Sequence, residues 1–151
     1  MKISLTKGAS EGPTKLNAFD NALLEADIGN VNLIPVSSML PADVEVVDMP
    51  DLQPGEMTNC VLSHQYSDNP GDEITAVIAY ATTSEMGCVV ETKGINRPVE
   101  ELKKEARFMA EYMLEKRNLE MIDYQCITQT HTVVDKASVV AALVYHDPKR
   151  H

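Results

Sequence analysis

The chain has 151 residues, 44% of them hydrophobic, and carries a formal net charge of −10 at pH 7. The length favours a single domain, 1–151, that buries most of its apolar surface without metals or disulfides. The acidic balance repels nucleic-acid phosphates, and no segment approaches the roughly 18 apolar residues of a membrane helix. Because the first residues also lack the apolar core of a signal peptide, we expect a cytoplasmic protein without nucleic-acid or membrane partners.

The N-terminal part is predicted to contain a strand, a loop and a helix. Alternating residues favour a strand over 2–7, and the glycine and proline content of 8–13 favours a loop. Leu16, Phe19, Leu23 and Ala26 then recur at spacings of three, four and three. This spacing predicts one apolar face of a helix over 15–27, with Thr14 as its N-cap.

A strand predicted over 31–36 leads directly into the Ser37-Ser38 pair. Pro35 has no N–H to give to a strand ladder, so this strand is expected at the edge of a sheet. Pro41 indicates a turn shortly afterwards. A Ser-Ser pair is usually an ordinary loop, but a strand end is a rigid platform that can hold a strained peptide bond.

The rest of the chain is predicted to be strands around one long helix. A helix over 99–117 is indicated by apolar residues at spacings of three and four, and 137–144 is so continuously apolar that we expect it to be buried on both faces. Residues 147–151 are expected to fray. With further strands, the total of two helices and about seven strands predicts the α+β class. These further strands are expected at 44–47, 58–66, 74–82, 86–92 and 121–133.

The chain lacks the familiar catalytic and metal-binding motifs, including GxSxG, the P-loop, HExxH and GxGxxG. Cys60, Cys88 and Cys126 are odd in number and have no CxxC spacing, so each is interpreted as a small buried hydrophobe. The histidines have no metal-ligand spacing either, and His131 is interpreted as a hydrogen-bonded structural residue within a strand. No metal site is therefore expected.

Several stretches that include Ser37-Ser38 resemble the pyruvoyl-dependent arginine decarboxylases. They keep their order and spread over nearly the whole chain, and the first cluster is the most specific. The matching stretches are Leu16 to Asp20, Ala22 to Leu24, Ile28 to Leu33, Ser37-Ser38, Ser67-Asp68 with Pro70-Gly71, Val90-Glu91 followed by Gly94, and His131 to Val133.

The resemblance implies a fold, an assembly and a cofactor. The fold would be a four-layer αββα sandwich, assembled as a homotrimer or a dimer of trimers with the pocket between neighbouring subunits. The Ser38 hydroxyl would attack the Ser37 carbonyl and cleave the chain into a β chain, 1–37, and an α chain, 38–151. Ser38 would become a covalent pyruvoyl group, which takes the place of pyridoxal phosphate as an electron sink, and no metal would be needed.

The resemblance also implies roles for single residues. Glu91 would be the catalytic acid, and a raised pKa is expected because it follows an apolar run; otherwise it is an exposed strand-end glutamate. Asp20 would bind the substrate guanidinium and Leu23 would line the same pocket, although Asp20 alone could simply be exposed or paired with a lysine. Asn32 would polarise the Ser37 carbonyl or, with Ser37, hold the substrate, but it could also be a turn residue.

The chain departs from the family pattern at three places: Lys15, Pro35 and the Thr92-Lys93 pair. None of these is a catalytic residue, but they leave the substrate and the rate of self-cleavage open. The activity implied is conversion of L-arginine to agmatine and CO2, and agmatine could serve polyamine biosynthesis or acid resistance. The alternatives are a pyruvoyl decarboxylase of another amino acid and a non-catalytic regulatory paralogue of the same fold.

Overall fold

The computed structural model describes residues 1–146 and contains two helices and nine strands in two sheets. The expectation for residues 147–151 lies outside this range. The helices are α1 (Lys15–Glu25) and α2 (Val99–Glu115). The five-stranded sheet has the order β2 (Asn32–Pro35), β5 (Met57–Ser67), β9 (Ala137–His146), β1 (Lys2–Glu11), β4 (Glu45–Val46). The four-stranded sheet has the order β3 (Met39–Pro41), β7 (Met86–Ile95), β6 (Glu73–Thr82), β8 (Asp123–Thr132).

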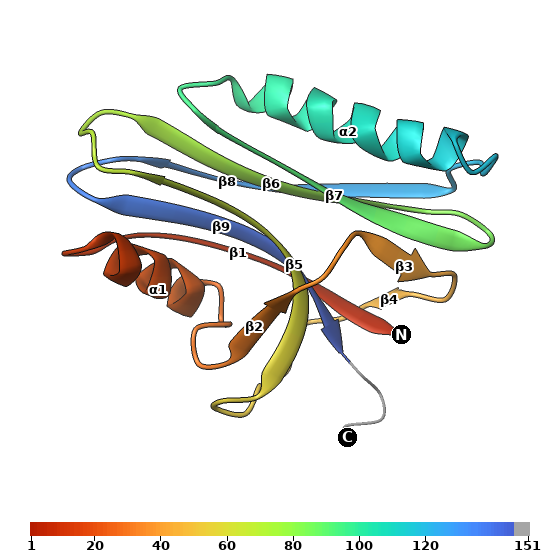
Figure 1. The fold of residues 1–151 in the computed structure, drawn as a ribbon, viewed down its shortest axis with the longest axis horizontal. Coiled ribbons are helices and arrows are strands. Elements are labelled where there is room, and N and C mark those ends of the chain that lie inside the picture. The colour runs from red at the N-terminus through yellow and green to blue at the C-terminus, as the bar shows by residue number, and fades with distance from the viewer. Residues whose placement is uncertain (147–151) are drawn as a thin grey trace.

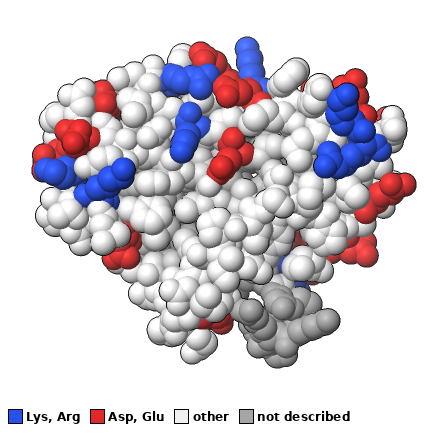
Figure 2. Space-filling model, viewed as in Figure 1, with Lys and Arg blue, Asp and Glu red and all other residues white. Residues whose placement is uncertain are grey.

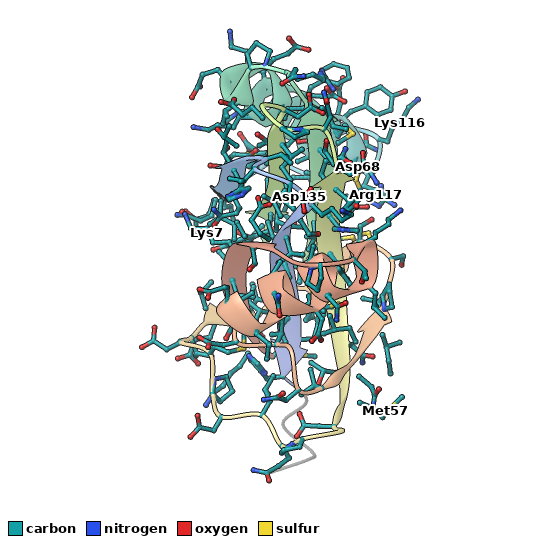
Figure 3. The ribbon with its side chains drawn as sticks, turned by 90° about the vertical axis from the view of Figure 1, so that its left-hand side faces the viewer. Lys7, Met57, Asp68, Lys116, Arg117 and Asp135 are labelled. Atoms are coloured by element: carbon teal, nitrogen blue, oxygen red, sulfur yellow. The ribbon has the colours of Figure 1, made fainter. Side chains whose placement is uncertain are left out.

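The two sheets pack face to face with one helix on each outer side, so the predicted αββα sandwich is confirmed (Figure 1). Helix α1 packs on β1 and β9, whereas α2 packs on β7 and β6. Three apolar clusters fill the spaces between these layers, one between the sheets and one under each helix. Seen from the side, α2 lies at the top, α1 lies in front of the strands, and Met57 lies at the far end from α2 (Figure 3).

Strand β9 is the centre of the five-stranded sheet, between β5 and β1. Its residues 137–144 are all buried, as their continuous apolarity predicts. One set of side chains, including Leu143, packs between the sheets, and the alternate set, including Val140, packs under α1. This strand therefore joins two of the three apolar clusters.

The predicted loop over 8–13 is wrong, because β1 continues to Glu11 and pairs with β9 along its whole length. The glycines that suggested a loop have another cause. A Cβ on Gly8 would clash with the Ala22 carbonyl oxygen, and one on Gly12 would clash with the Ala18 backbone nitrogen. Because Gly8 and Gly12 have no side chain, the backbone of α1 can pack directly against β1 and the residues that follow it. Composition alone does not distinguish this use of glycine from a turn.

The other predicted elements agree with the structure apart from their ends. Thr14 caps α1, and its Oγ1 accepts a hydrogen bond of 3.1 Å from the Asn17 N–H. This helix ends at Glu25 rather than 27, because Asp27 adopts a left-handed φ of 62°. Strand β2 is an edge strand, as Pro35 predicts, but β3 was not predicted because its pairing with β7 is only three residues long.

The cysteine and histidine interpretations are largely confirmed. Cys60 and Cys88 are buried, whereas Cys126 lies on the edge strand β8 and is partly exposed. His131 Nε2 lies 2.6 Å from Glu11 Oε2, as expected of a hydrogen-bonded structural histidine. Within residues 1–146, no three His, Cys, Asp or Glu side chains are grouped to hold a metal ion. None of the helices described is long and apolar enough to cross a membrane.

Candidate functional site

The Ser37-Ser38 pair lies where the chain crosses from one sheet to the other. Strand β2 belongs to the five-stranded sheet and ends at Pro35, and β3 belongs to the four-stranded sheet and begins at Met39. The link between them is held at each end by one backbone hydrogen bond. Val36 N–H donates to the Cys60 carbonyl at 2.9 Å, and Val89 N–H donates to the Ser38 carbonyl at 2.8 Å.

The middle of the link, between these two hydrogen bonds, is less constrained. Ser37 is exposed and Ser38 is partly buried. Neither backbone group of Ser37 makes a hydrogen bond with another described residue, and neither does the Ser38 hydroxyl. The peptide bond between the serines is thus anchored on both sides, while its own carbonyl and the adjacent hydroxyl have no competing partner within residues 1–146.

A pocket of about 490 Å³ opens beside this link. It brings together Ser37, Ser38 and Glu91, three of the residues predicted from the sequence to act at the site. Apart from these three, the pocket is lined by apolar and aromatic side chains from four segments of the chain. Those side chains belong to Val36, Val61, Val89, Val90, Phe108, Met109, Tyr112 and Met113.

The pocket forms where both sheets have an unpaired edge. Strand β2 pairs with β5 only as far as Cys60, and β3 pairs with β7 only from Met86 to Cys88. On this side, the following lengths 61–67 and 89–95 have no strand neighbour among the described residues. Because a short strand covers only part of each edge, the backbone beyond it is left open to a ligand or another chain.

Glu91 stands on β7 within this unpaired length. Its side chain is exposed in the single chain, yet the pocket walls around it exclude enough water to raise its pKa, as predicted. Lys93, two residues further along the strand, opposes this shift. A carboxyl group with a raised pKa keeps its proton closer to neutral pH and can deliver it to a reacting atom.

Asp20 and Leu23 are on α1 and do not line this pocket. Asp20 is exposed and forms no ion pair with any described residue, so pairing with Lys15 or Lys7 is not seen. Leu23 is only 8% exposed and packs in the apolar cluster under α1. The single chain therefore keeps these two residues apart from Ser38.

Asn32 is also separate from the pocket. It lies at the start of β2, where its Nδ2 donates a 3.0 Å hydrogen bond to the Gly55 carbonyl. Residues 32–36 run extended along β5, and this length spans roughly 13 Å. The Asn32 amide is thus out of reach of the Ser37 carbonyl of its own chain.

The site fits a pyruvoyl group made from Ser38. Such a group keeps the Ser38 main-chain carbonyl, which the Val89 N–H already holds. Its ketone carbon would be the former α-carbon of Ser38, and its methyl carbon would be the former β-carbon. The group therefore needs no more room than the serine. The surrounding valines and methionines would shield the ketone from water.

The α2 residues of the pocket were not predicted as site residues. Met109 and Met113 were assigned to the apolar face of the helix, and they do pack against the cluster under α2. Phe108 and Tyr112 are exposed, although they are large and apolar. Two aromatic residues at exposed helical positions were the only signal in the sequence that could have identified this wall.

The comparisons with known proteins show the family of the chain. The family model for pyruvoyl-dependent arginine decarboxylase matches residues 2–150. A protein of that name from Methanothermobacter thermautotrophicus is 51% identical over 97% of both chains. Another from Methanocaldococcus jannaschii is 40% identical over 95% of this chain and 89% of its own, and one from Pyrococcus abyssi is 39% identical over 95% and 93%. The chain belongs to the pyruvoyl-dependent arginine decarboxylase family, which is a family of carboxy-lyases.

Proposed function

We propose that this protein converts L-arginine to agmatine and CO2, with a pyruvoyl group that it makes from its own Ser38. Family membership supports the reaction. The observation that carries the proposal for this chain is that Ser37, Ser38 and Glu91 share one pocket. That pocket combines a cleavable serine pair with an acid whose pKa is raised.

Self-cleavage begins with attack of the Ser38 hydroxyl on the Ser37 carbonyl carbon, which turns the amide into an ester and frees the Ser38 amine. Loss of the Ser38 α-proton then breaks the bond from its β-carbon to the ester oxygen. This step releases Ser37 as a carboxylate and leaves dehydroalanine at position 38. Water replaces the nitrogen of that residue, ammonia leaves, and the pyruvoyl group remains at the start of chain 38–151.

Glu91 acts after decarboxylation. The pyruvoyl ketone supplies an electron sink for the pair of electrons left when CO2 departs. Glu91 donates its proton to the former α-carbon of the substrate, because it lies in the same pocket as position 38 and keeps a proton above the usual glutamate range. The apolar walls exclude water that would compete as a proton donor.

The pocket of one chain is incomplete for an arginine substrate. Among residues 1–146, Glu91 is the only acidic residue that lines it, and the acid is needed for proton transfer. We propose that a neighbouring copy supplies Asp20 to bind the guanidinium, together with Leu23 and Asn32, in a homotrimer or a dimer of trimers. The broad face over β5 and the β2–β3 link supports this contact, because most of its middle, below the charged side chains of the upper part, is uncharged (Figure 2).

The two products of cleavage would stay together without the peptide bond. The β chain, 1–37, contributes β1, α1 and β2. Strand β1 pairs with β9 over ten residues, from Lys2 to Glu11, and β2 pairs with β5. Each part therefore completes the sheet and core of the other, which supports one domain over 1–151. Function in the cytoplasm is part of the proposal.

Two other functions remain as alternatives. A pyruvoyl decarboxylase of another amino acid would keep the same cleavage but bind a different side chain. A regulatory paralogue would keep the fold without catalysis. The free Ser38 hydroxyl and the raised pKa of Glu91 favour an enzyme over a paralogue.

Two measurements on purified protein test the proposal. Intact mass should show two chains, with the second beginning at a residue 38 that has lost the mass expected for conversion to pyruvoyl. Release of CO2 should then be highest with arginine among arginine, ornithine, lysine, histidine and aspartate. A processed protein that prefers another amino acid supports the first alternative, and an intact, inactive chain supports the second.

A further inference from the structure

Helix α2 carries two large aromatic side chains on its exposed surface, one turn apart. Phe108 is 66% exposed and Tyr112 is 51% exposed, and their ring centroids are 6.2 Å apart. Other residues, including Leu102 and Leu114, are buried and attach the helix to its sheet. Packing of α2 therefore does not account for the exposed aromatic pair.

Both rings line the same pocket as Ser38 and Glu91. A substrate that reacts at position 38 and takes a proton from Glu91 must have its α-carbon between these residues. Its side chain then has to follow the remaining lining, which is apolar and includes the two rings. Since Glu91 is the only charged residue of the lining within the described part of the chain, a cationic side chain meets mainly apolar and aromatic surfaces there.

We propose that Phe108 and Tyr112 form an aromatic wall that binds the methylenes and the flat guanidinium of the substrate, and so determine specificity for arginine. This inference rests on the proposed function. A guanidinium is planar and weakly hydrated and stacks on aromatic rings, whereas a compact ammonium holds its water more strongly. Stacking uses the faces of the guanidinium and leaves its N–H edges for a carboxylate such as Asp20 of a neighbouring copy.

The rings near α2 already accept cations from the protein itself. The Lys116 ammonium lies 5.7 Å from the centroid of the Tyr112 ring. The Arg107 guanidinium lies 4.7 Å from the centroid of the Tyr124 ring. The Tyr112 ring of the pocket therefore already attracts a positive charge within the protein.

The test compares the self-cleaved wild type with the double variant Phe108→Leu/Tyr112→Leu. Release of CO2 gives KM and kcat for arginine. Agmatine and 1,5-diaminopentane are compared as inhibitors, because they have similar chains and end in a guanidinium and an ammonium respectively. Size-exclusion chromatography and intact mass report the oligomer and self-cleavage.

In the double variant we expect KM for arginine and the inhibition constant of agmatine to rise about tenfold, while kcat changes less than about twofold. The rings contact the side chain and not the reacting atoms, so they stabilise the bound substrate and the transition state equally. The inhibition constant of 1,5-diaminopentane should rise less than about threefold, because an ammonium gains less from a ring. Tyr112→Phe should recover most of the affinity that Tyr112→Leu loses.

Val134→Ala is the matched control, because Val134 is an exposed apolar residue, 72% accessible, and does not line the pocket. It should leave all the constants unchanged. If KM for arginine and the inhibition constant of agmatine are equal in the wild type and the double variant, the proposed aromatic wall is overturned. Loss of the oligomer in the double variant would assign the rings to a contact between copies and also overturn it. If the wild type cleaves itself but does not act on arginine, both the proposed function and the aromatic wall are overturned. If the wild type is active and the double variant is unaffected, only the aromatic wall is overturned.

Discussion

Two of the short links that carry the chain from one sheet to the other are bonded in opposite ways. The link 133–136, between β8 and β9, is held throughout: Val134 and Asp135 N–H groups donate to Glu11, and the Lys136 carbonyl accepts from Gly12 N–H. The link 36–38, between β2 and β3, is held only at its two ends. Both links join the same pair of sheets, so topology alone does not explain the difference.

The contrast indicates what the proposed self-cleavage would need. A carbonyl that already accepts hydrogen bonds and a backbone fixed by its neighbours resist the change of geometry that nucleophilic attack requires. The link 36–38 combines fixed ends with a free peptide bond in the middle, and it lies beside the Glu91 pocket.

Ser38→Ala should abolish cleavage completely, because it removes both the attacking hydroxyl and the β-oxygen that must leave. The purified variant should have the mass of one uncleaved chain and no decarboxylase activity. The matched experiment places a serine pair in the bonded link through the variant V134S/D135S. That pair should stay intact on intact-mass analysis, since its N–H groups remain bonded to Glu11. Cleavage there would show that the dipeptide suffices and that its setting does not matter.

Asp20→Ala and Glu91→Gln should each lower activity by roughly 100-fold or more when purified separately. If Asp20 acts in the pocket of a neighbouring copy, co-expression of the two variants should restore part of the activity, because some pockets then receive both intact residues. Activity of the separated and co-expressed proteins checks this. Lack of any recovery would mean that both residues serve the same chain's pocket, and a double Asp20→Ala/Glu91→Gln chain provides the baseline.

Gly12→Ala should destabilise the bonded link by about 3 kcal/mol, because the new Cβ meets the Ala18 backbone and pushes Gly12 away from Lys136. Urea unfolding of the uncleaved Ser38→Ala background measures the free energy without interference from cleavage. Gly55→Ala is the control: its φ of +80° is unfavourable for alanine, but nothing lies within 4 Å of the added atom. A smaller loss at Gly12 than at Gly55 would contradict the close-packing explanation.

Glu11→Gln should reduce stability by about 1 kcal/mol at neutral pH, because it weakens the hydrogen bonds to the link 133–136. Burial alone would raise the pKa of Glu11, but hydrogen bonds from Asp135, His131 and Val134 outweigh burial and lower it. A lowered carboxyl pKa stabilises the fold fully above the ordinary value of 4.5, and this contribution is lost as pH falls through the lower folded value.

Melting temperatures between pH 7 and pH 3 test whether the stabilisation by Glu11 is lost as the pH falls. The difference between wild type and Glu11→Gln should be constant above about pH 5 and should shrink at lower pH. An equal difference at all pH values would mean that the ionised carboxylate is not what holds the link. Self-cleavage should be unaffected, because Glu11 does not line the pocket.

Much of the fold was predictable from local patterns. Local sequence patterns predicted three features correctly. These are the buried faces of both helices, the Thr14 cap and the burial of β9 on both sides. The predictions of local structure were wrong where a residue type that is common in turns has another structural role. Gly8 suggested a turn but allows a helix to cross a strand, and Pro41 suggested a turn but ends the short strand β3.

The sequence by itself determined the α+β class, the family resemblance and the identity of the serine pair and Glu91, because these depend on residue type and order along the chain. Only the tertiary structure decided which of these residues meet. It brought Ser38, Glu91 and the α2 rings into one pocket and kept Asp20, Leu23 and Asn32 outside it. The physical reason is that β2 and β3 are too short to cover the sheet edges, and the length of edge left open depends on pairing between distant segments.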